Sequence, residues 1–133
     1  MVTVIDKVAW IHTENGKVLS TRSRGKDAYY LPGGKREPGE SDLDTLVREI
    51  REELTVAIAP ASATPLGVFE AQAHGHPDGV LVRMTCYTAA YEGSLQPSSE
   101  IDEVVWLTYA DRQRISPVDR LIFDHLHTAG LLA

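Results

Sequence analysis

The segment from residue 33 to residue 54 concentrates acidic side chains that could bind a cation. Carboxylates three or four positions apart on a helix repel each other by a few tenths of a kcal/mol per pair. Either solvent screens these charges, or a positive group lies between them. The acidic residues of the segment are Glu37, Glu40, Asp42, Asp44, Glu49, Glu52 and Glu53, and its basic residues are Lys35, Arg36, Arg48 and Arg51.

The residues after Ser41 predict an amphipathic helix that ends near Leu54. Ser41 is the expected N-cap, and Asp42 and Asp44 suit the positive end of the helix dipole. Apolar residues recur at helical spacing and define the face that packs on the core. This stripe consists of Leu43, Leu46, Val47, Ile50 and Leu54.

The same helix would bring three glutamates onto one face. At about 100° per residue, Glu49 and Glu53 lie about 40° apart, and Glu52 lies about 60° from Glu49. Arg48 and Arg51 are expected on the opposite side of the stripe, where they would neutralise the acidic face poorly. A solvated surface would explain such a face, and so would a site for a hard divalent cation, which prefers oxygen ligands.

The spacing of the segment resembles the Nudix box, whose pattern is G-x5-E-x7-R-E-U-x-E-E-x-G-U with U an apolar residue. Gly34, five residues, Glu40, seven residues and then REIREELTV at 48–56 match this pattern. Thr55 is the single departure, because the family usually has glycine there. We expect Thr55 to leave the helix with a negative φ, since a β-branched residue adopts a positive φ only at a cost of roughly 1 to 2 kcal/mol.

The resemblance implies a hydrolase that cleaves a nucleoside diphosphate linked to another moiety, with Mg²⁺ or Mn²⁺ as cofactor. It implies that Glu52 and Glu53 bind the metal, and that Glu49 is either a ligand or the base that activates water. The backbone carbonyl of Gly33 is a further candidate ligand. The resemblance also implies structural support from Gly34, and an ion pair between Arg48 and Glu40 that orients the loop and the carboxylates.

Outside the box, the resemblance suggests a further acidic ligand or base at Glu100, with Asp102 and Glu103 as rivals. Candidate ligands of the substrate phosphates are Arg22, Arg24, Lys26 and Lys35, for which surface solubility is the alternative. His74 and His76 have the spacing of a metal pair, but such a pair in a hairpin loop is more often on the surface. Aromatic residues that could stack on a base, or pack in the core, are Tyr29, Tyr30 and Phe69.

Composition places the chain among ordinary globular proteins of one domain, residues 1–133. With 133 residues, 43% hydrophobic and 24% charged, it can bury a substantial core. A net charge of −6 argues against duplex nucleic acid and anionic membranes as partners. The single cysteine, Cys86, is expected to be a buried thiol in a reducing compartment. No stretch is long and apolar enough for a membrane span, so we expect a cytoplasmic protein. The sequence leaves the oligomeric state open, and a homodimer is one alternative.

The order of the predicted elements is mixed, with three strands, a helix, four strands and a second helix. This order favours a mixed sheet with helices packed on both faces, and it resembles the Nudix α/β/α sandwich, an α+β arrangement. Expected strands cover 3–13, 17–23, 28–31, 56–59, 65–75, 79–93 and 103–109, and expected helices cover 42–54 and 117–129. A further helix start is expected at Thr108 with Asp111.

The box indicates a diphosphate and a metal but does not identify the rest of the substrate. The small size of the chain and the LPGGK segment resemble nucleoside triphosphate pyrophosphatases, so a (d)NTP is the first expectation. Two alternatives stay open. One is a Nudix hydrolase of another diphosphate, such as a nucleotide sugar, and the other is a nucleotide sensor of the same fold that does not cleave its ligand.

Overall fold

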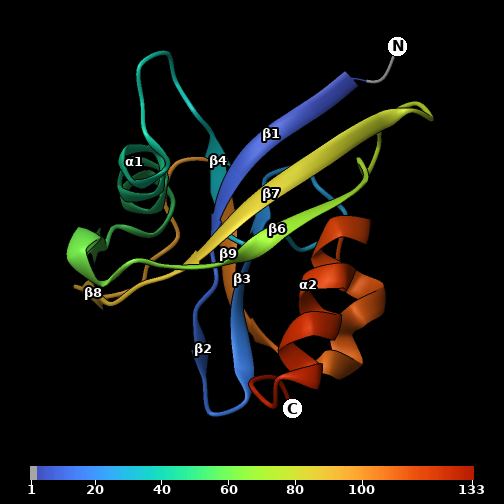
Figure 1. Ribbon diagram of the computed structural model, residues 1–133. Coiled ribbons are helices and arrows are strands. Elements are labelled where there is room, and N and C mark those ends of the chain that lie inside the picture. Colours follow the sequence, from blue (N-terminus) through green and yellow to red (C-terminus); the bar gives the residue numbers. More distant parts are fainter. Residues whose placement is uncertain (1–2) are drawn as a thin grey trace.

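The computed structural model describes residues 3 to 133, with the strands lying between two helices (Figure 1). Helix α1 (Asp42–Leu54) and helix α2 (Pro117–Thr128) lie on opposite sides of the strands. The expected sandwich with helices on both faces is therefore confirmed. None of the helices in the described part of the chain is long and apolar enough to cross a membrane.

The largest sheet is mixed and has the strand order β4-β1-β7-β6. Strand β1 runs parallel to β7, whereas the β1–β4 and β6–β7 pairs are antiparallel. The bounds in this sheet are β1 Thr3–Trp10, β4 Gly33–Lys35, β6 Thr64–Gln72 and β7 Val80–Thr88. A second sheet contains β2 Thr13–Glu14, β3 Lys17–Ser23 and β9 Ile101–Leu107, and a third pairs β5 Ala57–Ile58 with β8 Tyr91–Glu92.

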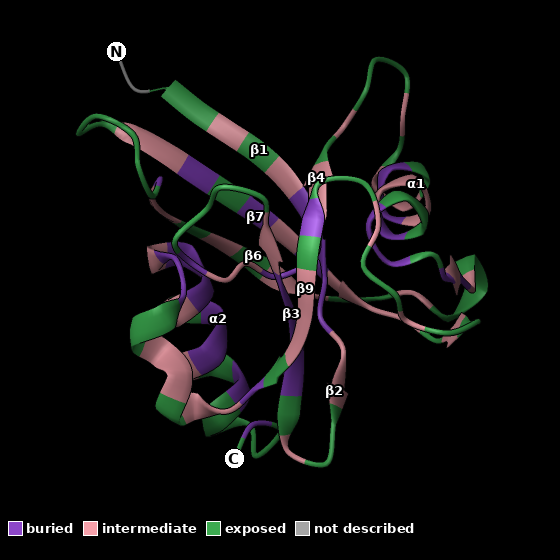
Figure 2. Ribbon diagram, turned by 180° about the vertical axis from the view of Figure 1, so that it is seen from behind, coloured by how far each residue is buried: buried purple, intermediate pink, exposed green. Residues whose placement is uncertain are grey.

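Alternation along β1 divides the core into two clusters, one on each face of the strands. Val8 and Trp10 pack in the cluster that contains the buried face of α1, whereas Ala9 packs in the cluster that contains α2. This follows from the period of two along a strand, which points successive side chains to opposite faces. The buried residues accordingly lie along the middle strands and the inner side of α2 (Figure 2). The same division buries Cys86, as expected.

Two of the expected elements differ from those observed, and one further element was not expected. Residues 28–31 do not form a strand, because Tyr29 and Tyr30 make only isolated bridges. The start at Thr108 has its capping box but opens a 3₁₀ helix, Tyr109–Arg114, that ends before α2. A short 3₁₀ turn, Pro60–Ser62, follows β5.

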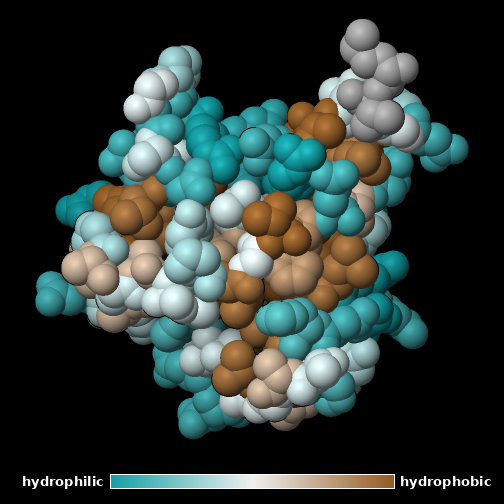
Figure 3. Space-filling view, viewed as in Figure 1, coloured by the Kyte–Doolittle hydropathy of each residue, from teal (hydrophilic) through white to brown (hydrophobic). Residues whose placement is uncertain are grey.

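Apolar side chains gather near the centre of one face, between the two helices (Figure 3).

Helix α1 begins as expected and ends differently. Ser41 and Asp44 form a reciprocal capping box at its N-terminus. At its C-terminus Thr55 has φ 64° and ψ 19°, so the prediction of a negative φ is wrong. The Thr55 N–H makes the last helical bond, to Arg51 O at 3.1 Å, and the left-handed turn at Thr55 is followed by Val56, which is 1% exposed in the core. The Thr55 hydroxyl also donates to Ser94 O at 3.2 Å. These contacts outweigh the local preference of a β-branched residue.

Candidate active site

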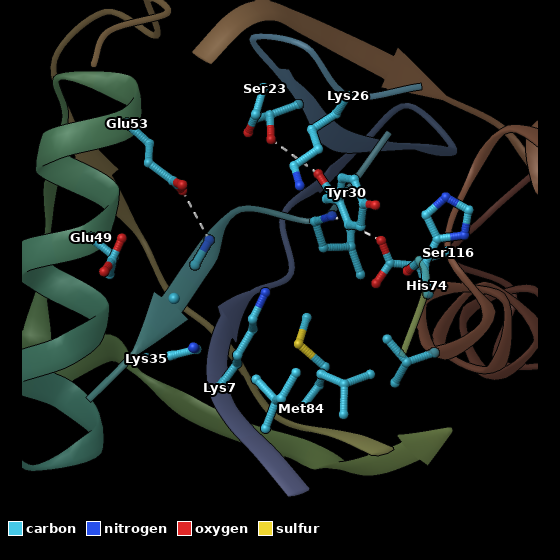
Figure 4. A pocket seen from close by; sticks show the side chains of 18 of the residues that line it. Lys7, Ser23, Lys26, Tyr30, Lys35, Glu49, Glu53, His74, Met84 and Ser116 are labelled. Atoms are coloured by element: carbon cyan, nitrogen blue, oxygen red, sulfur yellow. Dashed lines mark hydrogen bonds between the residues drawn. The ribbon is translucent and has the colours of Figure 1, made fainter. Parts of the chain in front are cut away.

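A cavity of about 340 Å³ lies between α1, the start of α2 and the strands. Its size is within the range of small-molecule sites. Glu49 and Glu53 face it from α1 and Lys7 points into it from β1, while His74 and Ser116 lie on the opposite side (Figure 4). The cavity therefore joins residues that are far apart in the sequence.

Glu53 is the most buried carboxylate at the α1 end of the cavity, with 6% of the residue exposed. Its Oε1 accepts the N–H of Gly33 at 3.0 Å. Burial, reinforced by the charges of Glu49 and Glu100, raises the pKa of Glu53 to about 8 against the effect of the Gly33 bond. The protein thus holds a carboxylate where its negative charge is costly unless a cation is near.

Glycine at position 34 leaves room for the carboxyl group of Glu49, which lies directly over it. A Cβ built on Gly34 would lie 2.4 Å from the Glu49 Cδ. Gly33 is more strongly constrained, because it has φ 148° and a Cβ there would lie 2.0 Å from the backbone oxygen of Val8. The two glycines therefore let β4 pass close to α1 and β1, which brings backbone and carboxylates together.

Arg48 ties the loop before α1 to the helix. Its Nε and Nη2 donate to the two oxygens of Glu40 at 2.7 and 2.8 Å, and Nη2 also donates to Lys35 O at 3.1 Å. Such bidentate pairs combine strength with fixed geometry. The pair with Arg48 lowers the pKa of Glu40 to about 2. This is the orienting ion pair that the resemblance implies.

The expectation that Arg48 would neutralise the acidic face poorly is wrong. Its Nη1 lies 3.0 Å from Glu49 Oε1 and 3.6 Å from Glu52 Oε2. Helical side chains lean toward the N-terminus, and the long arginine side chain reaches around the helix to this face. Arg51, by contrast, is exposed.

Glu52 does not line the cavity. It is exposed and lies beside Arg48. Within residues 3 to 133, no three His, Cys, Asp or Glu side chains converge closely enough to enclose a metal ion. The oxygen donors of Glu49, Glu53 and Glu100 nevertheless share one end of the cavity, and this donor set suits a hard divalent cation.

Among the acidic candidates Glu100, Asp102 and Glu103, only Glu100, which directly precedes β9, lines the cavity. A hydrogen bond from Ser99 lowers the pKa of Glu100. Glu103 points elsewhere, accepting from Arg22 at 2.8 Å and from the Tyr29 hydroxyl at 3.0 Å. Asp102 lies 3.9 Å from Arg24.

The basic candidates separate into two groups. Lys26 and Lys35 line the cavity, whereas Arg22 and Arg24 do not. Arg22 is paired with Glu103, and Arg24 is exposed and donates weakly to Ser99 O at 3.5 Å.

Some of the aromatic and histidine candidates line the cavity, and others lie elsewhere. Tyr30, His74 and His76 line the cavity, and His74 Nε2 lies 3.1 Å from Asp27 Oδ1. Phe69 lies elsewhere, with its ring centroid 5.6 Å from that of His125. Tyr29 packs partly on the core below the Arg114 guanidinium.

Sequence reasoning missed two cavity residues, Lys7 and Asp119. Asp119 lies in the first turn of α2. Lys7 left a visible signal, because it and Asp6 are charged residues within a largely apolar strand. A charge at such a position indicates a polar environment inside the fold.

Comparison with known proteins agrees with this fold. The profile of the NUDIX domain matches residues 5–126. A Bacillus subtilis protein named Nudix hydrolase YvcI is 29% identical over 112 residues, which are 83% of this chain and 71% of that protein. An RNA pyrophosphohydrolase of Halorhodospira halophila is 40% identical over 57 residues, or 43% of this chain, and the match spans only 30% of that enzyme.

Two solved structures resemble the whole fold. The ORF135 protein of E. coli has a TM-score of 0.73 and 26% identity, over 96% of this chain and 94% of that one. A MutT Nudix hydrolase of Burkholderia pseudomallei has a TM-score of 0.76 and 22% identity, over 92% and 97% of the two chains. The fold is the one found in Nudix hydrolases. The chain belongs to the Nudix hydrolase family.

Proposed function

We propose that this protein hydrolyses a phosphoanhydride bond of a nucleoside diphosphate derivative with Mg²⁺ or Mn²⁺, and that a (d)NTP is cleaved to the monophosphate and pyrophosphate. The observation that carries the proposal is the buried Glu53, fixed by the Gly33 N–H at 3.0 Å at the carboxylate end of the cavity. A bound cation lowers the pKa of water and withdraws charge from the phosphates.

The carboxylates of this end, together with the exposed Glu52 beside Arg48, have distinct roles in the proposal. Glu53 and Glu52 bind the cation, and Glu49 either binds it or takes the proton of the attacking water. Glu100 is a further ligand or base, and the carbonyl of Gly33 is a further ligand.

The surrounding residues position this group. Arg48 holds Glu40 and the carbonyl of Lys35, and so fixes the loop against α1. The Lys35 ammonium attracts the substrate phosphates, because the side chain lines the cavity beside the carboxylates. Phosphoryl transfer depends mainly on positioning and charge neutralisation, which this arrangement supplies.

The decisive experiment is a panel of (d)NTPs, nucleotide sugars and 5′-triphosphorylated RNA with Mg²⁺, with monophosphate, phosphate and pyrophosphate measured separately. We expect release of pyrophosphate from at least one (d)NTP. Release of other products from (d)NTPs would contradict the proposed cleavage. Hydrolysis of nucleotide sugars or RNA alone would show that the substrate is not a (d)NTP. Binding without any hydrolysis would favour the sensor alternative.

A further inference from the structure

One face of the largest sheet carries exposed side chains beyond the part that α1 covers. Lys7, Val82 and Met84 line the cavity, so the alternation along β1 and β7 points their neighbours to the opposite face. Helix α1 packs on this opposite face at Val8 and Trp10. Figure 3 shows this side of the molecule, with apolar side chains between the two helices. The residues of the uncovered part are Val4, Asp6, Val68, Glu70, Leu81, Arg83 and Thr85.

Apolar side chains of this face are accessible to solvent. Val68 on β6 is 61% exposed and Val4 on β1 is 38% exposed. In the register of the strands, Val68 lies beside Thr85 of β7, and Val4 lies beside the partly exposed Leu81. An exposed apolar surface bordered by polar residues is typical of a protein interaction site.

A row of four charged side chains crosses the face between these apolar residues. The strand register places Asp6 beside Arg83, and Arg83 beside Glu70. Arg83 Nε lies 2.9 Å from Glu70 Oε2. Arg36, which follows β4, extends the row beyond Asp6, because its Nη1 lies 2.9 Å from Asp6 Oδ2. From Arg36 to Glu70, the charges are positive, negative, positive and negative.

An alternating row of four charges is complementary to the same row reversed. Two sheets can pack face to face with their strands nearly aligned, and a two-fold axis parallel to the strands would reverse the row of one copy against that of the other. Arg36 of one copy then faces Glu70 of the other, and Asp6 faces Arg83. Both kinds of contact occur twice, and every contact joins opposite charges.

We propose that this face binds a second copy of the chain and forms a two-fold symmetric homodimer. Apolar contacts around Val68 and Leu81 supply the affinity, and the row of charges fixes the orientation, because charge complementarity contributes more to specificity than to affinity. The net charge of the row is zero, which argues against a polyanion as the occupant. The inference concerns a surface apart from the cavity and does not depend on the proposed function.

The mass of the wild-type protein in solution is the first test. Sedimentation equilibrium at roughly 100 μM protein detects an interface of micromolar Kd. In a low-salt buffer, we expect a mass near twice the 14.6 kDa of the chain. Raising the salt concentration should weaken the dimer, because ions screen the contacts between the charged rows. A monomer at this concentration in low salt would overturn the inference.

Val68→Glu tests whether this face forms the contact. A carboxylate in place of the apolar side chain should raise the Kd of the dimer at least about tenfold, because its burial is costly. Leu121→Glu is the matched control, since it makes the same kind of change at a 42% exposed residue of α2 and should leave the Kd unchanged. Thermal melts establish that both variants fold. A Kd that Val68→Glu leaves unchanged, or that both variants raise equally, would contradict the proposed face.

Charge exchange tests the reversed alignment of the two rows. A homodimer of Asp6→Arg would set positive charges against each other, and a homodimer of Arg83→Asp would set negative charges against each other. Each variant alone should therefore be monomeric where the wild type dimerises. In an equimolar mixture, the new arginine of one variant faces the new aspartate of the other, and the unchanged Arg83 and Asp6 still face each other. The mixture should therefore form a heterodimer. A mixture that stays monomeric, or a single variant that dimerises like the wild type, would refute this alignment.

Discussion

Glu53 accepts the backbone N–H of Gly33 at 3.0 Å, and this bond joins the last turn of α1 to β4. The hydrogen bond holds a 6% exposed carboxylate at the cavity although burial and the charge of Glu49 oppose its ionisation. The fold therefore maintains an arrangement that costs stability in the free protein. Such costs are typical of functional sites.

Glu53→Gln should reduce turnover on the order of 10² or more while the protein stays folded. The amide oxygen can still accept the Gly33 N–H, but the cation loses a charged ligand and the repulsion with Glu49 is removed. Steady-state rates with Mg²⁺ and a thermal melt measure the two effects. Glu92→Gln, at an exposed residue of β8 outside the cavity, is the control and should keep full turnover. Wild-type turnover of Glu53→Gln would exclude Glu53 from the metal site.

Millimolar Mg²⁺ should raise the melting temperature of the wild-type protein. A ligand that binds only the folded state stabilises it by RT ln(1 + [L]/Kd), about 2.7 kcal/mol at a hundred times Kd. The shift should be smaller in Glu53→Gln, since one ligand has lost its charge. A melt unchanged by both Mg²⁺ and Ca²⁺ would instead support a solvated acidic surface.

Thr55→Gly should stabilise the protein by about 1 kcal/mol relative to Thr55→Ala. Thr55 has φ 64°, a conformation that glycine adopts without the cost of a Cβ. Both variants lose the hydroxyl bond to Ser94 O, so the comparison isolates the backbone effect. Chemical denaturation measures the difference.

The turnover of Thr55→Gly tests whether threonine, in place of the usual glycine of the Nudix box, affects the site. We expect turnover of Thr55→Gly within tenfold of wild type, because the carboxylates precede the exit of the helix. A gain in turnover of more than tenfold corresponds to an activation free energy lowered by more than roughly 1.4 kcal/mol. Such a gain would show that threonine impairs the site and would favour the sensor alternative.

Asp119→Asn should become more stable relative to wild type as the pH rises from about 4 to about 7. Burial raises the pKa of Asp119 to about 7 from an ordinary value of 3.8, with Lys7 partly opposing the shift. In this interval the folded wild type keeps a proton that the unfolded chain has lost, so wild-type stability falls with rising pH. Urea unfolding across this range measures the difference. Asp78→Asn, at an exposed loop residue, is the control, and an equal pH trend in both variants would contradict the assignment to Asp119.

Local spacing determined the parts of this protein that lie close together in the chain. The N-cap at Ser41, the apolar stripe of α1 and its end at Leu54 follow from a helical period and a capping signal within a few residues. The ion pair of Arg48 with Glu40 also spans only eight residues, and the box pattern identified it. These interactions need little of the tertiary fold, so sequence reasoning could find them.

Tertiary structure decided the rest, because the deciding contacts join distant segments. Lys7 and Asp119 share a cavity only because β1 and the start of α2 border the same space, a relationship that no local period encodes. Thr55 adopts its left-handed conformation against its own preference because Val56 must enter the core and Ser94 accepts its hydroxyl. Packing and long-range hydrogen bonds together exceed the 1 to 2 kcal/mol by which a single residue prefers another backbone conformation.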